Sequence, residues 1–179
     1  MSTYHHGDLR TATVQAAEEI LEEHGIAALS IREAARRAGV SHNAPYRHFP
    51  DRDSLLAELA AQGFRLLGEE LRTRRGREMG EAYVRFALAH PERFRLMFGP
   101  QLRHERYPAL REAAQQTYNA LVAAFRADGA IADPDKAAAA AWSLVHGLAH
   151  LILDGQLKND ASFVRDVICA VRFAAYRSA

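Results

Sequence analysis

The stretch Ser30–Phe49, which reads SIREAARRAGVSHNAPYRHF, decides the fold of this chain. Ser30 and Glu33 have the spacing of a capping box, in which the serine accepts from the Glu33 amide and the glutamate reaches back, so a short helix begins here. Gly39-Val40-Ser41 predicts a sharp turn, because glycine supplies the backbone freedom that such a turn needs. Ser41 is then the expected N-cap of a second short helix that ends at Phe49-Pro50. Two short helices joined in this way predict a helix-turn-helix.

This stretch is more basic than the chain as a whole. It holds Arg32, Arg36, Arg37 and Arg47 against Glu33, and four positive charges minus one give a local net charge of +3. The 179-residue chain has a net charge of only +1, so its overall charge gives no support for nucleic-acid binding. The local basic face does fit contact with phosphates. The alternative is a helical hairpin with an ordinary solvated face.

Helical periodicity assigns the two faces of the second short helix. Pro45 and Phe49 are apolar and four residues apart, so they face inward, whereas Asn43 and Arg47 lie on the opposite side. Arginine pairs with guanine and asparagine with adenine in the major groove, so the outer face suits base reading. Neighbouring hydroxyl, imidazole and guanidinium groups suit phosphates, which fix register. The predicted DNA-contact set is Ser30, Arg32, Ser41, His42, Asn43, Ala44, Tyr46, Arg47, His48 and Arg52.

Helix signals also dominate the rest of the chain. Besides the two short helices, we expect helices over about 8–24 (N-cap Asp8, stop Gly25), 51–71 (N-cap Asp51), 78–90, 91–98, 110–128, 135–154 and 162–177. The prediction is an all-α fold of about nine helices. A three-helix head with the helix-turn-helix at residues 1–56 is joined by a long helix to a helical body at 57–179.

Several features favour the cytoplasm. Cys169 is the only cysteine, so no disulfide forms within the chain, and we expect an inert buried thiol. Met1–Arg10 has no apolar core and is not a signal peptide. Ala137–Leu153 carries no Asp, Glu, Lys or Arg but is shorter than the roughly 20 residues that span a membrane. It predicts a buried helix, and we expect no membrane partner.

Several stretches resemble the TetR family of bacterial regulators: Ser30–Ser41, Tyr46–Phe49 and Asp51–Leu56. Trp142, His146 and Gly147 resemble the Trp-His-Gly signature of one class of TetR C-terminal domain, and Tyr4–Arg10 resembles the leader often found with it.

The resemblance implies a homodimer, usually a repressor, that binds a palindromic operator and is modulated by a small ligand, without a cofactor. By position, Arg52 matches a phosphate contact at the start of the long helix, Tyr46 and His48 match backbone contacts, and His42–Ala44 match base-reading positions. Pro45 departs from the family, which usually has a larger aliphatic residue there, and it removes an amide.

The last two expected helices are candidates for a dimer interface. Their apolar stripes could form an intermolecular four-helix bundle, which would place two reading elements about 34 Å apart. The alternative is that they are core. The predicted dimer residues are Leu144, Leu148, Leu151, Phe163, Val167 and Val171.

A mostly apolar cavity with few polar groups is the usual small-molecule site, and aromatic residues gather in the middle helices. The predicted ligand contacts are Phe64, Tyr83, Phe86, Phe94, Met97, Phe98, Tyr118, Trp142 and His146, with plain core as the alternative. His146, His150 and Asp154 recur every four residues, a spacing that could bind a metal in a metal-dependent enzyme. No motif completes such a site, so we expect neither metal nor enzyme activity. A ligand-free architectural DNA-binding protein is the third possibility.

Overall fold

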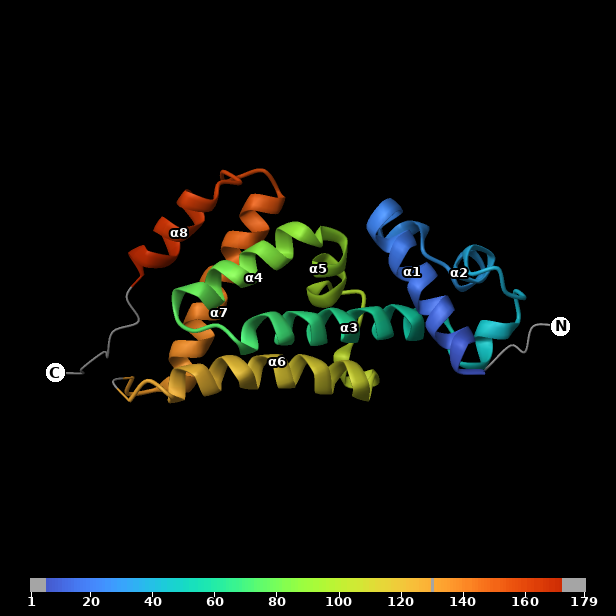
Figure 1. The fold of residues 1–179 in the computed structure, drawn as a ribbon, viewed down its shortest axis with the longest axis horizontal. Coiled ribbons are helices and arrows are strands. Elements are labelled where there is room, and N and C mark those ends of the chain that lie inside the picture. Colours follow the sequence, from blue (N-terminus) through green and yellow to red (C-terminus); the bar gives the residue numbers. More distant parts are fainter. Residues whose placement is uncertain (1–5, 130, 172–179) are drawn as a thin grey trace. The chain divides into compact units, whose positions relative to one another are not determined.

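The structure, a computed structural model, describes residues 6–129 and 131–171 (Figure 1). Every regular element in this part of the chain is helical, which confirms the all-α prediction. The elements are α1 (His6–Ala28), α2 (Ile31–Arg37), the 3-10 helix η1 (Ala44–Arg47), α3 (Arg52–Arg72), α4 (Arg77–Ala89), α5 (Pro91–Phe98), the 3-10 helix η2 (His104–Arg106), α6 (Pro108–Arg126), α7 (Pro134–Leu153) and α8 (Ala161–Ala170). The described residues thus contain eight α-helices, because the expected helix at 41–49 is only a 3-10 turn.

Contacts divide the chain into two compact units. The described part of the first unit comprises residues 6–64 and 90–113, and that of the second comprises 65–89, 114–129 and 131–171. The helix-turn-helix lies in the first unit together with α5 and η2, which come from the middle of the chain. The sequence boundary at residues 56 and 57 does not coincide with this grouping and stays a prediction.

Short polar side chains set several helix boundaries. The Ser54 amide donates to Asp51 Oδ1 over 2.7 Å at the start of α3, which confirms the expected cap. Asp133 accepts from the Lys136 amide at the start of α7. The structure starts α1 at His6, and the Asp8 side chain, the expected N-cap, lies outside the described residues. Gly25 has φ 75°, but helical residues continue to Ala28, so it interrupts α1 rather than ending it.

The first unit is built around α1, which packs against α2 and α5. Its fully buried side chains include Ile20, Leu21, Phe94 and Met97. Gly63 of α3 allows α5 to approach closely, because a Cβ at that position would lie 2.6 Å from Met97 Sδ.

The second unit packs α4 against α7 and α8 (Figure 1). A Cβ at Gly80 of α4 would lie 3.3 Å from both Val145 Cγ1 and Ile168 Cδ1, so the missing side chain permits the close packing of these helices. Among the described residues α7 is long and apolar enough to cross a membrane by length and composition, yet only 28% of its most apolar window is buried. The prediction that this helix is buried within the chain is therefore wrong for much of its surface.

Candidate DNA interface and ligand-binding residues

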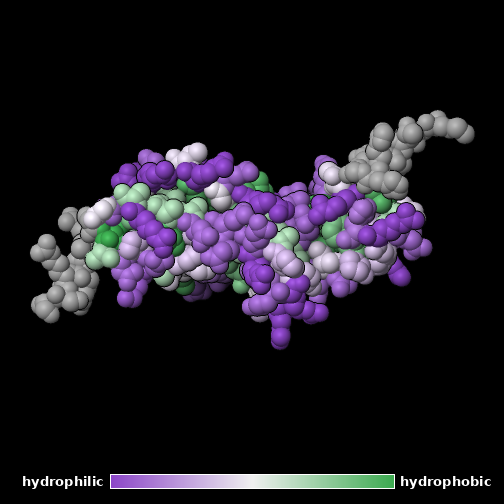
Figure 2. Space-filling view, turned by 90° about the horizontal axis from the view of Figure 1, so that it is seen from below, coloured by the Kyte–Doolittle hydropathy of each residue, from purple (hydrophilic) through white to green (hydrophobic). Residues whose placement is uncertain are grey.

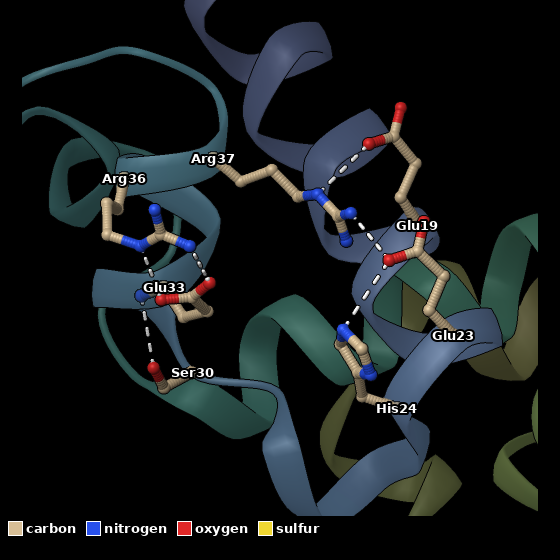
Figure 3. Close-up of polar contacts among 7 residues, drawn as sticks. All are labelled: Glu19, Glu23, His24, Ser30, Glu33, Arg36 and Arg37. Carbon is tan, nitrogen blue, oxygen red and sulfur yellow. Dashed lines mark hydrogen bonds and ion pairs between the residues drawn. The ribbon is translucent and has the colours of Figure 1, made fainter.

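The first helix of the predicted reading element begins as expected. Ser30 Oγ accepts from the Glu33 amide over 3.1 Å, which caps α2 (Figure 3). The Glu33 carboxylate, expected to reach back to Ser30, instead accepts from Arg36 Nε at 2.9 Å and Nη2 at 2.6 Å. The hydrogen bond from Arg36 lowers the pKa of Glu33, which keeps this carboxylate ionised.

The second helix is a 3-10 turn because of Pro45. The Ala44 amide donates to the Ser41 carbonyl over 3.0 Å, but proline has no amide with which to continue an α-helical ladder. The amides of His48 and Phe49 then both donate to the Pro45 carbonyl at 2.9 Å. The N-cap is Asn43, without a side-chain hydrogen bond, so the prediction of an α-helix capped by Ser41 is wrong.

The two faces of this turn nevertheless follow the predicted pattern. Pro45 and Phe49 are buried, whereas Asn43 and Arg47 are exposed. The other members of the predicted contact set in this segment are exposed as well, except Ala44, which is half-buried: Ser41, His42, Tyr46 and His48. Beneath the turn, the guanidinium carbon of Arg10 lies 5.7 Å from the centre of the Phe49 ring. An apolar anchor thus leaves the polar side of the turn accessible.

Only part of the basic face is available to a partner. Arg37 pairs with Glu23 at 2.5 Å and with Glu19 at 3.3 Å, both on α1 (Figure 3), and Arg36 pairs with Glu33. Arg32 and Arg47 are exposed and have no carboxylate partner in the described part of the chain. The local charge of +3 therefore overstates the free positive charge of this surface.

Arg52, the first residue of α3, points back toward the end of α1. Its Nε donates to the Leu29 carbonyl over 2.7 Å and its Nη2 donates to the Ile26 carbonyl over 2.5 Å. The side chain is half-buried. Two of its three guanidinium nitrogens are thus already used inside the head.

The nine predicted ligand residues fall into two groups, one in each unit. In the first unit Phe64 meets the edge of Phe98, with ring centres 5.1 Å apart, and Phe94 lies 5.0 Å from Phe98. Phe94 and Met97 are completely buried, as expected of core. His104, which was not among the predicted ligand contacts, completes this group through its edge contact with Phe64.

The second group joins α4, α6 and α7 through aromatic and polar contacts. Trp142 Nε1 donates to Tyr83 Oη over 3.0 Å, and Tyr83 Oη lies 2.8 Å from His146 Nδ1. Tyr118 packs on Trp142 with ring centres 5.7 Å apart. His150, which was not among the predicted ligand contacts, has its ring centre 4.6 Å from that of His146. Phe86, the remaining predicted residue, is buried in the same unit.

Burial sets the protonation of this group. It raises the pKa of the Tyr83 phenol far above its usual value, so the hydroxyl keeps its proton. Burial and the neighbouring His150 lower the pKa of His146, which favours the neutral imidazole. With the Trp142 N–H directed at its oxygen, Tyr83 is then able to donate to the unprotonated His146 Nδ1.

Comparison with known proteins assigns both parts of the chain. Residues 14–59 match the family described as "Bacterial regulatory proteins, tetR family". Residues 77–169 match the family described as "Tetracyclin repressor-like, C-terminal domain". The chain belongs to the TetR family. It is therefore a DNA-binding transcriptional regulator with an N-terminal helix-turn-helix and a ligand-binding C-terminal domain, and not an enzyme.

Solved structures share the TetR-family fold over nearly the whole chain. A Rhodococcus sp. RHA1 protein described as having unknown function is 36% identical, with a TM-score of 0.80, covering 95% of this chain and 94% of its own. A tetR-family regulatory protein from Rhodococcus RHA1 is 19% identical, with a TM-score of 0.68 and coverages of 96% and 98%. The multidrug binding protein EbrR, complexed with imidazole, is 21% identical, with a TM-score of 0.65 and coverages of 94% and 96%. No functionally curated protein matches the chain.

Three interpretations of the sequence need correction for this TetR-family regulator. The metal-enzyme alternative built on His146, His150 and Asp154 falls with the family assignment, since the chain is a TetR-family regulator and not an enzyme. Within residues 6–129 and 131–171 no group of three or more histidine, cysteine, aspartate or glutamate side chains could hold a metal ion. Cys169 is exposed rather than buried, with Arg77 Nη1 3.8 Å from its sulfur. The ligand-free architectural alternative falls with the family assignment, since the C-terminal domain is a ligand-binding one.

The predicted dimer residues differ in exposure in this regulator. Leu148 is buried within the chain, and Leu144, Phe163 and Val167 are partly exposed. Leu151 and Val171 are 45% and 43% exposed, among the largest apolar exposures in the described residues. Figure 2 shows apolar surface between the hydrophilic side chains at its left-hand end, where helices of the second unit lie.

Proposed function

We propose that this TetR-family regulator binds a palindromic operator as a homodimer, represses transcription there, and leaves the DNA when a small aromatic ligand binds its C-terminal domain. The exposed polar face of the turn around η1 supports the DNA-reading part of this proposal. Asn43 and Arg47 offer the groups that pair with adenine and guanine, and neither is used in an ion pair within the described residues.

Phosphate contacts then fix the register of this face on the duplex. Arg32 on α2 is exposed and has no carboxylate partner among the described residues, and Tyr46 and His48 carry exposed donors on either side of Arg47. The hydroxyls of Ser30 and Ser41 and the bases facing His42 and Ala44 complete the proposed interface. The short turn exposes few base-reading groups, so one copy of the chain reads only a few base pairs.

Selection of bound duplexes from a random pool tests the operator proposal. A dimer with twofold symmetry should recover a palindromic consensus whose half-sites are about 10 base pairs apart, or a multiple of that spacing. A consensus without symmetry, or no enrichment above the starting pool, would contradict it. The starting pool itself is the control for non-specific binding.

The proposed dimer covers the exposed apolar side of α7 and α8. Leu151 and Val171 keep 45% and 43% of their surface in contact with water in a single chain, and Phe163 and Val167 are partly exposed. Such apolar exposure is unfavourable at about 25 cal/mol per Å². A second copy would bury them, and this also accounts for an apolar helix in a protein that we place in the cytoplasm. Leu151→Glu should give monomers in sedimentation experiments. Leu66→Glu, which alters a similarly exposed leucine (41%) on α3, is the matched control.

The half-exposed aromatic group of the second unit is our candidate ligand contact. Tyr118, Trp142 and His146 are accessible, whereas Phe94 and Met97 of the first unit are completely buried and suit core. Solved structures of EbrR carry imidazole and proflavin, both planar aromatic compounds. We further propose that Trp142, His146 and Gly147 mark the Trp-His-Gly class of C-terminal domain, because Tyr83 links the first two side chains.

Fluorescence offers a direct test, because Trp142 is the only tryptophan in the chain. Planar aromatic compounds that bind this group should quench or shift its emission, and aliphatic compounds of similar size should not. Tyr118→Leu should weaken the response by removing a ring that packs on Trp142. Compounds that change DNA binding while leaving Trp142 emission unchanged would contradict this location for the site.

A further inference from the structure

One arginine closes the helix-turn-helix at its base. The segment from Ser30 to Asp51 contains α2, the Gly39 turn and η1. It begins directly after Leu29 and ends directly before Arg52. Because Arg52 hydrogen-bonds to the Leu29 carbonyl, the two ends of the reading segment are joined across 23 positions of sequence.

The second hydrogen bond ties the same residue to α1. Arg52 Nη2 donates to the Ile26 carbonyl in the last turn of α1, which also accepts from the Leu29 amide over 3.3 Å, and Leu29 itself directly follows α1. A guanidinium suits this position, because its planar fork serves two acceptors at once and its charge is favourable at a helix C-terminus. Leu29 is 1% exposed, so its carbonyl belongs to a region that water reaches poorly.

The neighbouring contacts fix the other side of the same junction. The Ser54 amide donates to Asp51 Oδ1, and the Asp51 amide donates to Ser54 Oγ over 3.3 Å, so the start of α3 is rigidly capped. Arg52 therefore projects from a fixed helix end onto a second fixed helix end. Any rotation of the reading segment about its base would lengthen at least one of the two hydrogen bonds.

We propose that Arg52 is a positioning residue, which holds the helix-turn-helix in its DNA-reading orientation and does not contact a phosphate. The resemblance to the family implies a phosphate contact at this place. While Arg52 keeps both backbone carbonyls, one of them beside a buried side chain, only its third guanidinium nitrogen, Nη1, remains for a phosphate. Arg47 has no such commitment in the described residues and is the matched control for loss of one positive charge.

Hydrogen exchange on the DNA-free protein tests whether the two hydrogen bonds of Arg52 hold the helix-turn-helix in place. Arg52→Lys keeps the charge but replaces the fork with a single ammonium, which cannot keep both hydrogen bonds in the same geometry. The amides of residues 31–49 should then exchange about tenfold faster as a group, whereas those of α5 should change little. Unchanged exchange across residues 31–49 would overturn the proposal.

Binding to a random-sequence duplex at several salt concentrations tests the role toward DNA. Loss of a phosphate contact makes the slope of log K against log salt less steep by about 0.9. Arg52→Gln should keep the wild-type slope, and Arg52→Met, which also removes the charge, serves in the same test if the glutamine variant does not fold. A slope that falls by about 0.9 in Arg52→Gln would overturn the proposal. The test depends only on DNA binding, so it does not require the proposed dimer or ligand.

Binding to a duplex that the wild-type protein selects provides a further measurement. A residue that only stabilises the fold would not change the ratio of affinities for this duplex and a random one. With the folded fraction checked by circular dichroism, Arg52→Lys should bind that duplex about tenfold or more weakly and the random duplex almost as well as wild type. Equal losses on the two duplexes, with a salt slope reduced as above, would make Arg52 a phosphate contact.

Discussion

Arg47 is the side chain best placed to discriminate between bases. It is exposed on the polar face of the turn, and the buried Pro45 and Phe49 hold that face outward. Arg47→Ala should weaken binding to a selected operator by about 1–3 kcal/mol and relax the preference at one base pair. Fluorescence anisotropy on the operator and on its single-base variants measures both effects.

The control for Arg47 is another exposed arginine of the same element. Arg36 already pairs with Glu33 through two hydrogen bonds, so Arg36→Ala should leave the base preference unchanged. If Arg47→Ala weakens the operator and a random duplex by the same factor, Arg47 contacts phosphate and the base-reading role is wrong.

The burial of His146 predicts a pH-dependent contribution to stability. Burial and His150 lower its pKa below the ordinary 6.5, so the unfolded chain binds more protons than the folded one in this range. The contribution of His146 to stability is complete above about pH 6.5 and is lost as the pH falls toward its folded-state pKa. His146→Gln should therefore flatten the decline of the melting temperature between about pH 7 and pH 5.

The matched control for this pH effect is His24, an exposed histidine 3.5 Å from Glu23. His24→Gln removes an imidazole from the protein surface and is the comparison for the histidine substitution itself. An identical decline in wild type and His146→Gln would show that the imidazole titrates alike in the folded and unfolded chains.

At the scale of elements, the sequence predicted local structure best where the residues that determine it are neighbours in the chain. The Ser30 cap, the Asp51 cap and the inward pair Pro45 and Phe49 each depend on spacings of three or four residues. The prediction of an α-helix over residues 41–49 was wrong, and the reason is local as well. Periodicity suggested an α-helix, but the missing amide of Pro45 decided the outcome.

Contacts between distant segments could not be predicted from spacing. Arg37 reaches Glu23 across fourteen positions, which removes charge from a face that looked free. Arg52 donates hydrogen bonds to carbonyls more than twenty positions earlier. Every residue has a backbone carbonyl, so the pattern of side chains cannot indicate which of them accepts. The grouping of residues 90–113 with the head depends on such contacts too, above all those of α5 with α1.

The packing of α5 on α1 includes a buried cation. Arg93 is 5% exposed; its Nε donates to Glu22 Oε1 over 3.1 Å and its Nη2 donates to Glu18. Arg93→Met should destabilise the protein by about 1–3 kcal/mol. This cost is low for the loss of a buried ion pair, because both glutamates keep some contact with water. Urea unfolding measures the loss.

Arg95 is a control on the same helix. It pairs with Glu92 at 2.8 Å, but its side chain is 41% exposed, so Arg95→Met should cost less than about 1 kcal/mol. Equal costs for the two substitutions would mean that burial does not strengthen the pairing of α5 with α1.

At the scale of the whole molecule, a dimer solves two problems that a single chain leaves open. One short turn presents too few groups to select a site among many competing sequences, and a twofold partner doubles the contacts. The proposed partner would also cover the apolar side chains that α7 and α8 leave exposed. Loss of the dimer should therefore reduce operator binding far more than binding to random DNA.

Regulation requires that the ligand and the operator oppose each other, and thermodynamic linkage makes that opposition symmetrical. A planar aromatic compound that changes Trp142 emission should weaken operator binding by roughly 5- to 150-fold, and saturating operator should weaken binding of the compound by the same factor. Titrations of each partner with and without the other measure both factors. Tyr118→Leu should reduce affinity for the compound while leaving operator affinity unchanged in its absence, because Tyr118 belongs to the second unit and the reading face to the first. A compound that alters Trp142 emission yet leaves operator affinity unchanged would show that this aromatic group is not the site of regulation.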